Sequence, residues 1–144
     1  MIANAAIYIA DPSLLGSRFL DCLEDILSYE SISDGNQATG IIITLKWGTM
    51  TLNFMPSDQL DPHLQGLIGY VRAHIVDDDS LGYALGRLNY VRMSLGCVIE
   101  HEEDSDDFVD FLFRFFGSLN GLLFFFDRLY DFTGDTLASS RIDD

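Results

Sequence analysis

The segment IIITLKWGTMTLNF, residues 41–54, carries the clearest fold signal in the chain. On both sides of Trp47-Gly48-Thr49, every second residue is apolar. A period of two is typical of a strand with one buried face, and the short connection returns the chain antiparallel to itself. The positions that share this face are Ile41, Ile43, Leu45, Met50, Leu52 and Phe54. The segment therefore predicts a β-hairpin.

The residues before this hairpin predict a strand and then a helix. The apolar run Asn4–Ala10 stops at Asp11-Pro12, an N-cap and first-turn pair typical of a helix start. Apolar side chains then recur at helical spacing up to Leu27, which predicts one buried helix face. These side chains are Leu15, Phe19, Cys22, Leu23, Ile26 and Leu27. The polar segment 31–39 predicts a loop.

Two more helices are expected after the hairpin. One starts at Asp61-Pro62 and runs to Ile75; the other follows residues 76–80 and ends near Gly96. Each carries two glycines on one side, and each glycine costs up to about 1 kcal/mol relative to alanine. The glycines are Gly66 and Gly69 in the first helix and Gly82 and Gly86 in the second. We expect the two glycine faces to meet in an antiparallel helical hairpin.

The last part of the chain repeats the order of the first. A strand from Cys97, a helix over residues 105–119 and two apolar strands up to residue 138 follow one another. Two strand-helix-strand-strand units, residues 4–55 and 97–138, thus flank a helical hairpin. We predict a single α+β domain over residues 1–144, with a mainly antiparallel sheet of about six strands covered by four helices.

The apolar segment Phe108–Phe126 is the one that could be mistaken for a membrane span. Asp110 and Arg114 would each cost about 2.5–3.5 kcal/mol near a bilayer centre, so we expect a buried helix followed by a buried strand. Phe113 and Phe116 widen its apolar stripe beyond one face, which offers a seat for a second copy of the chain. No basic region precedes the first apolar run, so we expect a cytoplasmic protein without a signal peptide.

The chain is strongly acidic. The formal net charge is −15, from 23 acidic and 8 basic residues. Residues 1–72 carry eight acids and three bases, a net of −5, and residues 73–144 carry fifteen acids and five bases, a net of −10. Such a field repels nucleic acids and anionic membranes and steers cationic partners toward the surface. We therefore expect no nucleic-acid or membrane partner.

Motifs for metal, nucleotide or nucleophilic chemistry do not occur. His101-Glu102 lacks the second histidine of a zinc helix, because Ser105 stands at its place, and the acids from Asp104 onward lack the glycine of a calcium loop. His63 and His74 lie about 16 Å apart along one helix, too far to share a metal. We expect no metal and no cofactor. The two cysteines, Cys22 and Cys97, are expected to be buried free thiols.

We predict that the protein binds a basic protein partner, in the manner of an inhibitor, an immunity protein or a chaperone. The expected contacts are acids in loops or at helix starts, with two tyrosines as aromatic anchors. They are Asp77, Asp78, Asp79, Tyr83, Tyr90, Glu100, Glu102, Glu103, Asp104 and Asp107. Two alternatives stay open: a ligand-binding or enzymatic pocket between sheet and helices that uses His101 with Glu100, or His74, for proton transfer, and a structural protein that assembles only with itself.

Overall fold

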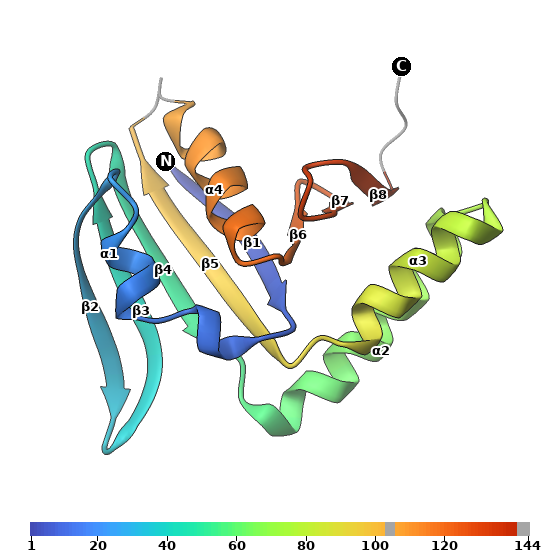
Figure 1. Cartoon of the computed structure of the whole chain (residues 1–144), viewed down its shortest axis with the longest axis horizontal. Coiled ribbons are helices and arrows are strands. Elements are labelled where there is room, and N and C mark those ends of the chain that lie inside the picture. The colour runs from blue at the N-terminus through green and yellow to red at the C-terminus, as the bar shows by residue number, and fades with distance from the viewer. Residues whose placement is uncertain (103–105, 141–144) are drawn as a thin grey trace.

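A computed structural model describes residues 1–102 and 106–140, and its centre is one antiparallel sheet (Figure 1). The sheet has eight strands in the order β2-β3-β4-β5-β1-β6-β7-β8, which confirms the α+β class and adds strands to the expected six. The strands are β1 (Ile2–Ile9), β2 (Ile26–Asp34), β3 (Gln37–Leu45), β4 (Gly48–Phe54), β5 (Met93–His101), β6 (Leu122–Phe125), β7 (Arg128–Tyr130) and β8 (Thr136–Ser139). The helices are α1 (Ser17–Asp21), α2 (Ser57–His74), α3 (Asp78–Asn89) and α4 (Asp107–Ser118), and a short 3₁₀ helix, η1, spans Pro12–Leu14.

The predicted hairpin is confirmed as β3 and β4, which pair from Gly40↔Asn53 to Leu45↔Gly48. The prediction that the first helix extends to Leu27 is wrong. Asp11 does cap a short 3₁₀ helix, through a hydrogen bond that its carboxylate accepts from the Ser13 N–H. However, α1 ends at Asp21 and the chain then pairs with β3 as the edge strand β2. The helical spacing was misleading because Ile26 and Tyr29 reach the same core from a strand.

Other predicted boundaries also differ from those in the structure. The second helix begins at Ser57, about a turn before Asp61-Pro62, so Pro62 lies inside it. The third ends at Asn89, because Met93 already belongs to β5 and pairs with Ile9. The helix and strand expected within Phe108–Phe126 are confirmed as α4 and β6. Within residues 1–102 and 106–140, no helix combines the length and the apolar character that crossing a bilayer requires.

The helices cover the two faces of the sheet unequally. Successive side chains of a strand point to opposite faces, so Ile7 and Ile9 enter the core under α1 and α4, whereas Tyr8 enters the core under α2 and α3. The first core is the larger and includes Phe111, Leu112, Phe115 and Phe116 of α4. The second core joins α2 and α3 to β1, β6, β7 and β8.

The aromatic stripe of α4 is packed inside the protein. Phe116 is fully buried, and Phe113 is half-buried with its ring centroid 5.0 Å from that of Tyr130. The wide stripe is therefore not an exposed docking surface, and it lends no support to a second copy of the chain. Self-association therefore stays a prediction, but the aromatic stripe no longer supports it.

The expected contact between glycine faces is wrong. Apolar side chains, including Leu67, Val71, Ala84 and Leu88, form the shared core of α2 and α3. All four glycines are exposed, and a Cβ atom added at any of them would have no neighbouring atom within 4 Å. The glycines therefore serve no close approach of the two helices within the chain.

Replacing Gly69 or Gly82 by alanine is expected to raise the free energy of unfolding by about 0.5–1 kcal/mol each. Alanine restricts the unfolded chain and meets no obstacle at these positions. Urea denaturation measures the effect. Gly40→Ala is the control with the opposite sign, because its Cβ would lie 2.4 Å from the Leu52 carbonyl oxygen of the neighbouring strand. A loss of stability in Gly69→Ala or Gly82→Ala would contradict the open helix faces.

Candidate functional site

The acids predicted to bind a partner form two groups, which lie at opposite sides of the molecule in Figure 1. One group, Asp77–Asp79, lies at the start of α3. The other group, which we call the β5–α4 acids, comprises Glu100, Glu102 and Asp107 and lies where β5 ends and α4 begins. All six residues are exposed. Glu103 and Asp104 lie outside the described residues. The predicted contacts therefore do not share one surface.

The α3 group has a structural explanation. The carboxylate of Asp77 accepts a hydrogen bond of 2.8 Å from the Ser80 N–H and so caps the helix. Hydrogen bonds from Ser80 hold the pKa of Asp77 below its usual value. Asp78 and Asp79 stand in the first turn, where negative charge complements the positive end of the helix dipole. These acids are what a helix start requires.

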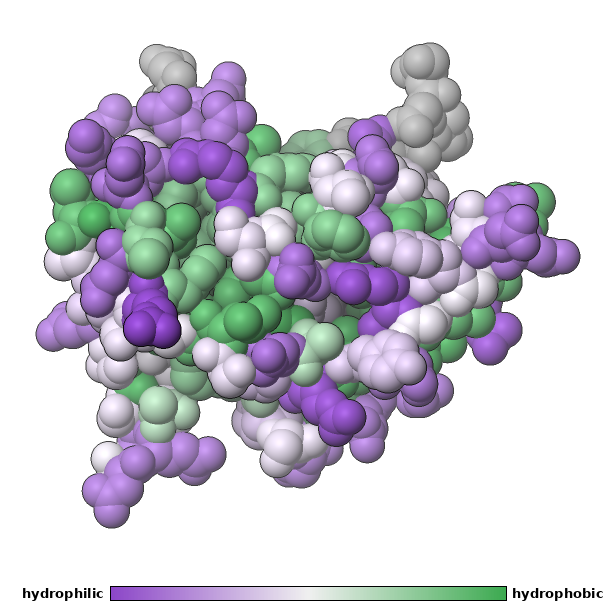
Figure 2. Space-filling model, in the orientation of Figure 1, coloured by the Kyte–Doolittle hydropathy of each residue, from purple (hydrophilic) through white to green (hydrophobic). Residues whose placement is uncertain are grey.

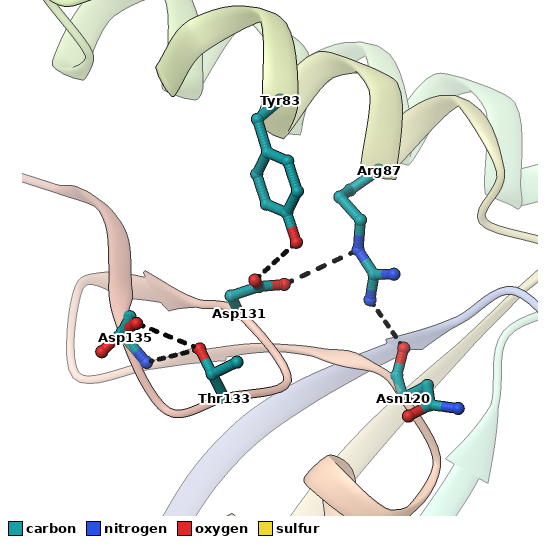
Figure 3. A network of polar contacts seen from close by, with 6 residues as sticks. All are labelled: Tyr83, Arg87, Asn120, Asp131, Thr133 and Asp135. Carbon is teal, nitrogen blue, oxygen red and sulfur yellow. Dashed lines mark hydrogen bonds and ion pairs between the residues drawn. The ribbon is translucent and has the colours of Figure 1, made fainter. Parts of the chain in front are cut away.

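Tyr83 also has a partner inside the protein (Figure 3). Its hydroxyl donates a 2.6 Å hydrogen bond to Asp131, whose carboxylate also lies 3.6 Å from Arg87 Nε. This hydrogen bond raises the pKa of Tyr83 above its usual value. Arg87 donates in turn to the Asn120 carbonyl at 2.7 Å. The network fastens α3 to the segments around β6 and β7.

The two predicted aromatic anchors differ in how they are held. Tyr83 keeps 44% of its surface exposed although its hydroxyl is engaged by Asp131. Tyr90, at the end of α3, is 65% exposed. Both lie on or at the end of α3, which is on the right of Figure 1, whereas the end of β5 and the start of α4 are at its upper left.

The β5–α4 acids lie beside an apolar groove. A cavity of about 640 Å³ opens between the first half of β1 and the turn that joins β6 to β7. We call it the β1 groove. It is lined by Met1, Ile2, Ala3, Asn4, Ala5, Ala6, His101, Phe108, Phe124, Phe125, Phe126 and Asp127. In Figure 2 the upper outline is hollowed between the parts that hold α4 and β7, and apolar surface lies in the hollow.

One wall of the groove is an aromatic stack. The His101 ring lies 4.1 Å from the Phe108 ring, nearly parallel to it, and Phe125 meets Phe108 edge to face. His101 Nδ1 is 2.8 Å from the Glu102 carbonyl oxygen. The half-buried His101 ring therefore serves mainly as a flat part of the groove wall. Of the other proposed proton-transfer residues, Glu100 is exposed on β5, and His74 is exposed at the end of α2 with Nδ1 2.8 Å from the Tyr70 carbonyl oxygen.

The opposite rim is a strained turn. Phe126 and Asp127, the two residues between β6 and β7, have φ values of 56° and 61°. Left-handed backbone at a bulky residue is unfavourable, and hairpin turns of this kind usually carry Asn or Gly. The Tyr70 hydroxyl holds the turn by donating a 2.7 Å hydrogen bond to the Asp127 carbonyl. Phe126 is 64% exposed at this rim.

A smaller cavity of about 340 Å³ lies between α2 and the sheet. The Tyr8 hydroxyl and His63 Nε2 are 2.7 Å apart beside it, so His63 is bound to the edge of the core, as its position on the helix predicts. Burial, with a smaller effect of Cys97, raises the pKa of Tyr8 to about 12. Tyr8 therefore stays protonated at ordinary pH and gives up its proton less readily than an ordinary tyrosine.

The cysteines are both free, but only Cys97 is buried. The prediction of burial is wrong for Cys22, because α1 ends one residue before it and leaves it on the surface. Burial raises the pKa of the Cys97 thiol to about 12, so it is not poised as a nucleophile. Among the described residues, no three His, Cys, Asp or Glu side chains come together as a metal site would require.

Sequence reasoning found the acids beside the β1 groove but not the groove itself. Its walls come from β1, β5, α4 and the β6–β7 turn, which are distant in the sequence. No family model matches the chain, and no curated protein or solved structure shows significant similarity to it.

Proposed function

We propose that this protein is a binding module for a basic protein partner, which it engages at the β5–α4 end of its sheet. The observation that carries the proposal is the juxtaposition of exposed acids with an apolar groove. Glu100 is paired with Ile2, and Glu102 and Asp107 adjoin His101 and Phe108 in the chain. Ile2, His101 and Phe108 line the groove.

Charge and apolar surface contribute differently to such binding. A net charge of −15 speeds the approach of a cationic protein and disfavours anionic ones. Tight binding also needs buried apolar contacts near the centre of the interface. The β1 groove supplies such surface next to the acids. The α3 acids support the proposal less, because the helix start accounts for them.

Retention of host proteins on the immobilised chain tests the proposal. We expect a basic protein to be retained at about 50 mM salt and released at about 500 mM, where charges more than a few ångströms apart are screened. A variant with Glu100→Gln, Glu102→Gln and Asp107→Asn is expected to lose that protein. The matched control, with Glu30→Gln, Asp34→Asn and Asp61→Asn, removes the same charge from exposed positions elsewhere and is expected to keep it.

Two outcomes would contradict the proposal. Equal loss in both variants would mean that only the overall field attracts the partner and that the β5–α4 end is not the site. Retention of no basic protein by the unaltered chain would remove the function itself. Complete self-association in sedimentation, with no foreign protein retained, would favour the structural alternative.

A further inference from the structure

The β1 groove contains a stretch of sheet that lacks a neighbouring strand. β1 pairs with β5 along its whole length, from Ile2↔Glu100 to Ile9↔Met93. On its other side β1 pairs with β6 only at Ala6, Ile7 and Tyr8. Within the described part of the chain, residues Ile2–Ala5 therefore form a strand edge inside the sheet, facing the groove.

The directions of the backbone groups on this edge follow from two backbone hydrogen bonds. The Met1 carbonyl accepts from the His101 N–H, so Met1 directs its backbone groups toward β5. The Ser94 carbonyl accepts from the Met55 N–H on the β4 side, which gives β5 the matching alternation. Because alternate residues of an antiparallel strand point their N–H and C=O groups to opposite sides, those of Ile2 and Asn4 point into the groove.

We propose that an extended segment of the basic partner adds to the sheet as a strand along Ile2–Ala5. This inference rests on the proposed function and specifies how that partner binds. The N–H and C=O groups of Ile2 and Asn4 would pair with the added backbone, which is how strand addition gains affinity. An exposed edge with apolar surroundings is otherwise an aggregation hazard.

The two faces of the added strand meet different surroundings. Its side chains on the α4 face lie against Ala3 and Ala5, which are small and leave room for apolar groups beside Phe108 and Phe125. Side chains on the opposite face lie on the same side of the sheet as Ile2 and its cross-strand neighbour Glu100. Asp127 adds a second acid at the far rim. The groove therefore suits a segment in which apolar and basic residues alternate.

Charge argues against a second copy of this chain as the occupant. Two molecules of net charge −15 repel each other, whereas a cationic segment is attracted to the same place. The strained turn supports a binding role, because Phe126 has a left-handed backbone and is nevertheless 64% exposed at the rim. Strain of this kind is often retained for function rather than for folding.

The probe is a synthetic peptide of about seven residues in which valine and lysine alternate, a length that covers the open edge. Titration at low salt, followed by NMR, gives the dissociation constant and the hydrogen exchange of each amide. We expect the Ile2 and Asn4 amides to exchange freely in the unbound protein and to become protected when the peptide binds. The amides of Ala3 and Ala5 face β5 and should be protected in both states.

Substitutions at Asn4 separate backbone from side-chain effects. Asn4→Pro removes the N–H that points into the groove, without removing a hydrogen bond to β5, and should weaken peptide binding by about tenfold or more. Asn4→Ala keeps the N–H and should bind within about twofold of the unaltered chain. Phe126→Asn suits the left-handed turn, so it should fold at least as well while binding the peptide several times more weakly. Thermal unfolding checks that each variant is folded.

Three results of the titration would overturn the inference. Absence of binding at about 1 mM peptide removes it. Binding that leaves the Ile2 and Asn4 amides unprotected and is indifferent to Asn4→Pro places the basic ligand elsewhere, and the proposed function then stands without strand addition. Protection of both amides in a dimer without peptide would make the edge a self-association site.

Discussion

Replacement of Asp131 by alanine is expected to lower the free energy of unfolding by about 3 kcal/mol, because it removes a buried carboxylate that is hydrogen-bonded by Tyr83 and faces the half-buried Arg87. Asp131 is only 6% exposed and accepts the hydrogen bond of Tyr83, and its other oxygen faces Arg87 Nε at 3.6 Å. That distance is too long for a hydrogen bond, so the contact with Arg87 is electrostatic. Urea denaturation at neutral pH measures the loss.

Two variants show where the loss originates. Asp135→Ala removes an exposed acid of the same turn and should change stability by no more than about 0.5 kcal/mol. Tyr83→Phe removes one hydrogen bond to a charged group and should cost about 1.5 kcal/mol. If Asp131→Ala cost no more than Asp135→Ala, the network would not be what fastens α3 to the sheet.

Alkaline conditions are expected to destabilise the fold by several kcal/mol between about pH 9 and pH 12. Cys97 has an ordinary pKa of 9.0 that burial raises to about 12, and Tyr8 has one of 10.0 that is raised to about 12. Both groups are neutral in the folded state and ionise more easily when unfolded. Their contribution is complete below the unfolded values and is lost as the pH rises through the folded ones. At about 1.4 kcal/mol per unit, the thiol alone accounts for about 4 kcal/mol.

Denaturation curves at a series of pH values test this dependence. Cys97→Ala should be less stable at neutral pH, because it leaves a small cavity, yet should lose less stability toward pH 12. Tyr8→Phe should flatten the same slope by a smaller amount. Cys22→Ser removes the exposed thiol and should leave the slope unchanged. An unaltered slope in Cys97→Ala would show that this thiol does not control alkaline unfolding.

Local patterns predicted much of the fold. The hairpin of residues 41–54 and helix α4 were found because each has apolar residues at the period of its own structure, and β6 was found as a short apolar run. The extent of α1 was not found. Ile26 lies at helical spacing from Cys22 and Leu23, and within β2 the half-buried residues Ile26, Tyr29 and Ile32 recur at every third position instead of every second. Pairing with β3, a contact that no local pattern reports, makes this segment a strand and not the end of a helix.

The candidate site was predicted only in its charged part. Acids near helix starts are usually exposed, and the six described ones are. The β1 groove depends on how far β6 extends along β1, which is set by the tight turn at Phe126 and Asp127. That turn has Phe126 at its first position and no glycine, so its place could not be inferred. The sole cue was the end of the aromatic run at Asp127-Arg128.

The place of β1 in the sheet bears on how the chain reaches this fold. β2, β3 and β4 are joined by hairpins, as are β6, β7 and β8, so each set can form from local contacts. β1 has no such neighbour: its partners are β5 and β6, which begin at Met93 and Leu122. Such distant pairing is slow, because a long loop must close before any contact is gained. During synthesis, β1 must therefore wait until β5 and then β6 have been made before it can pair with either of them.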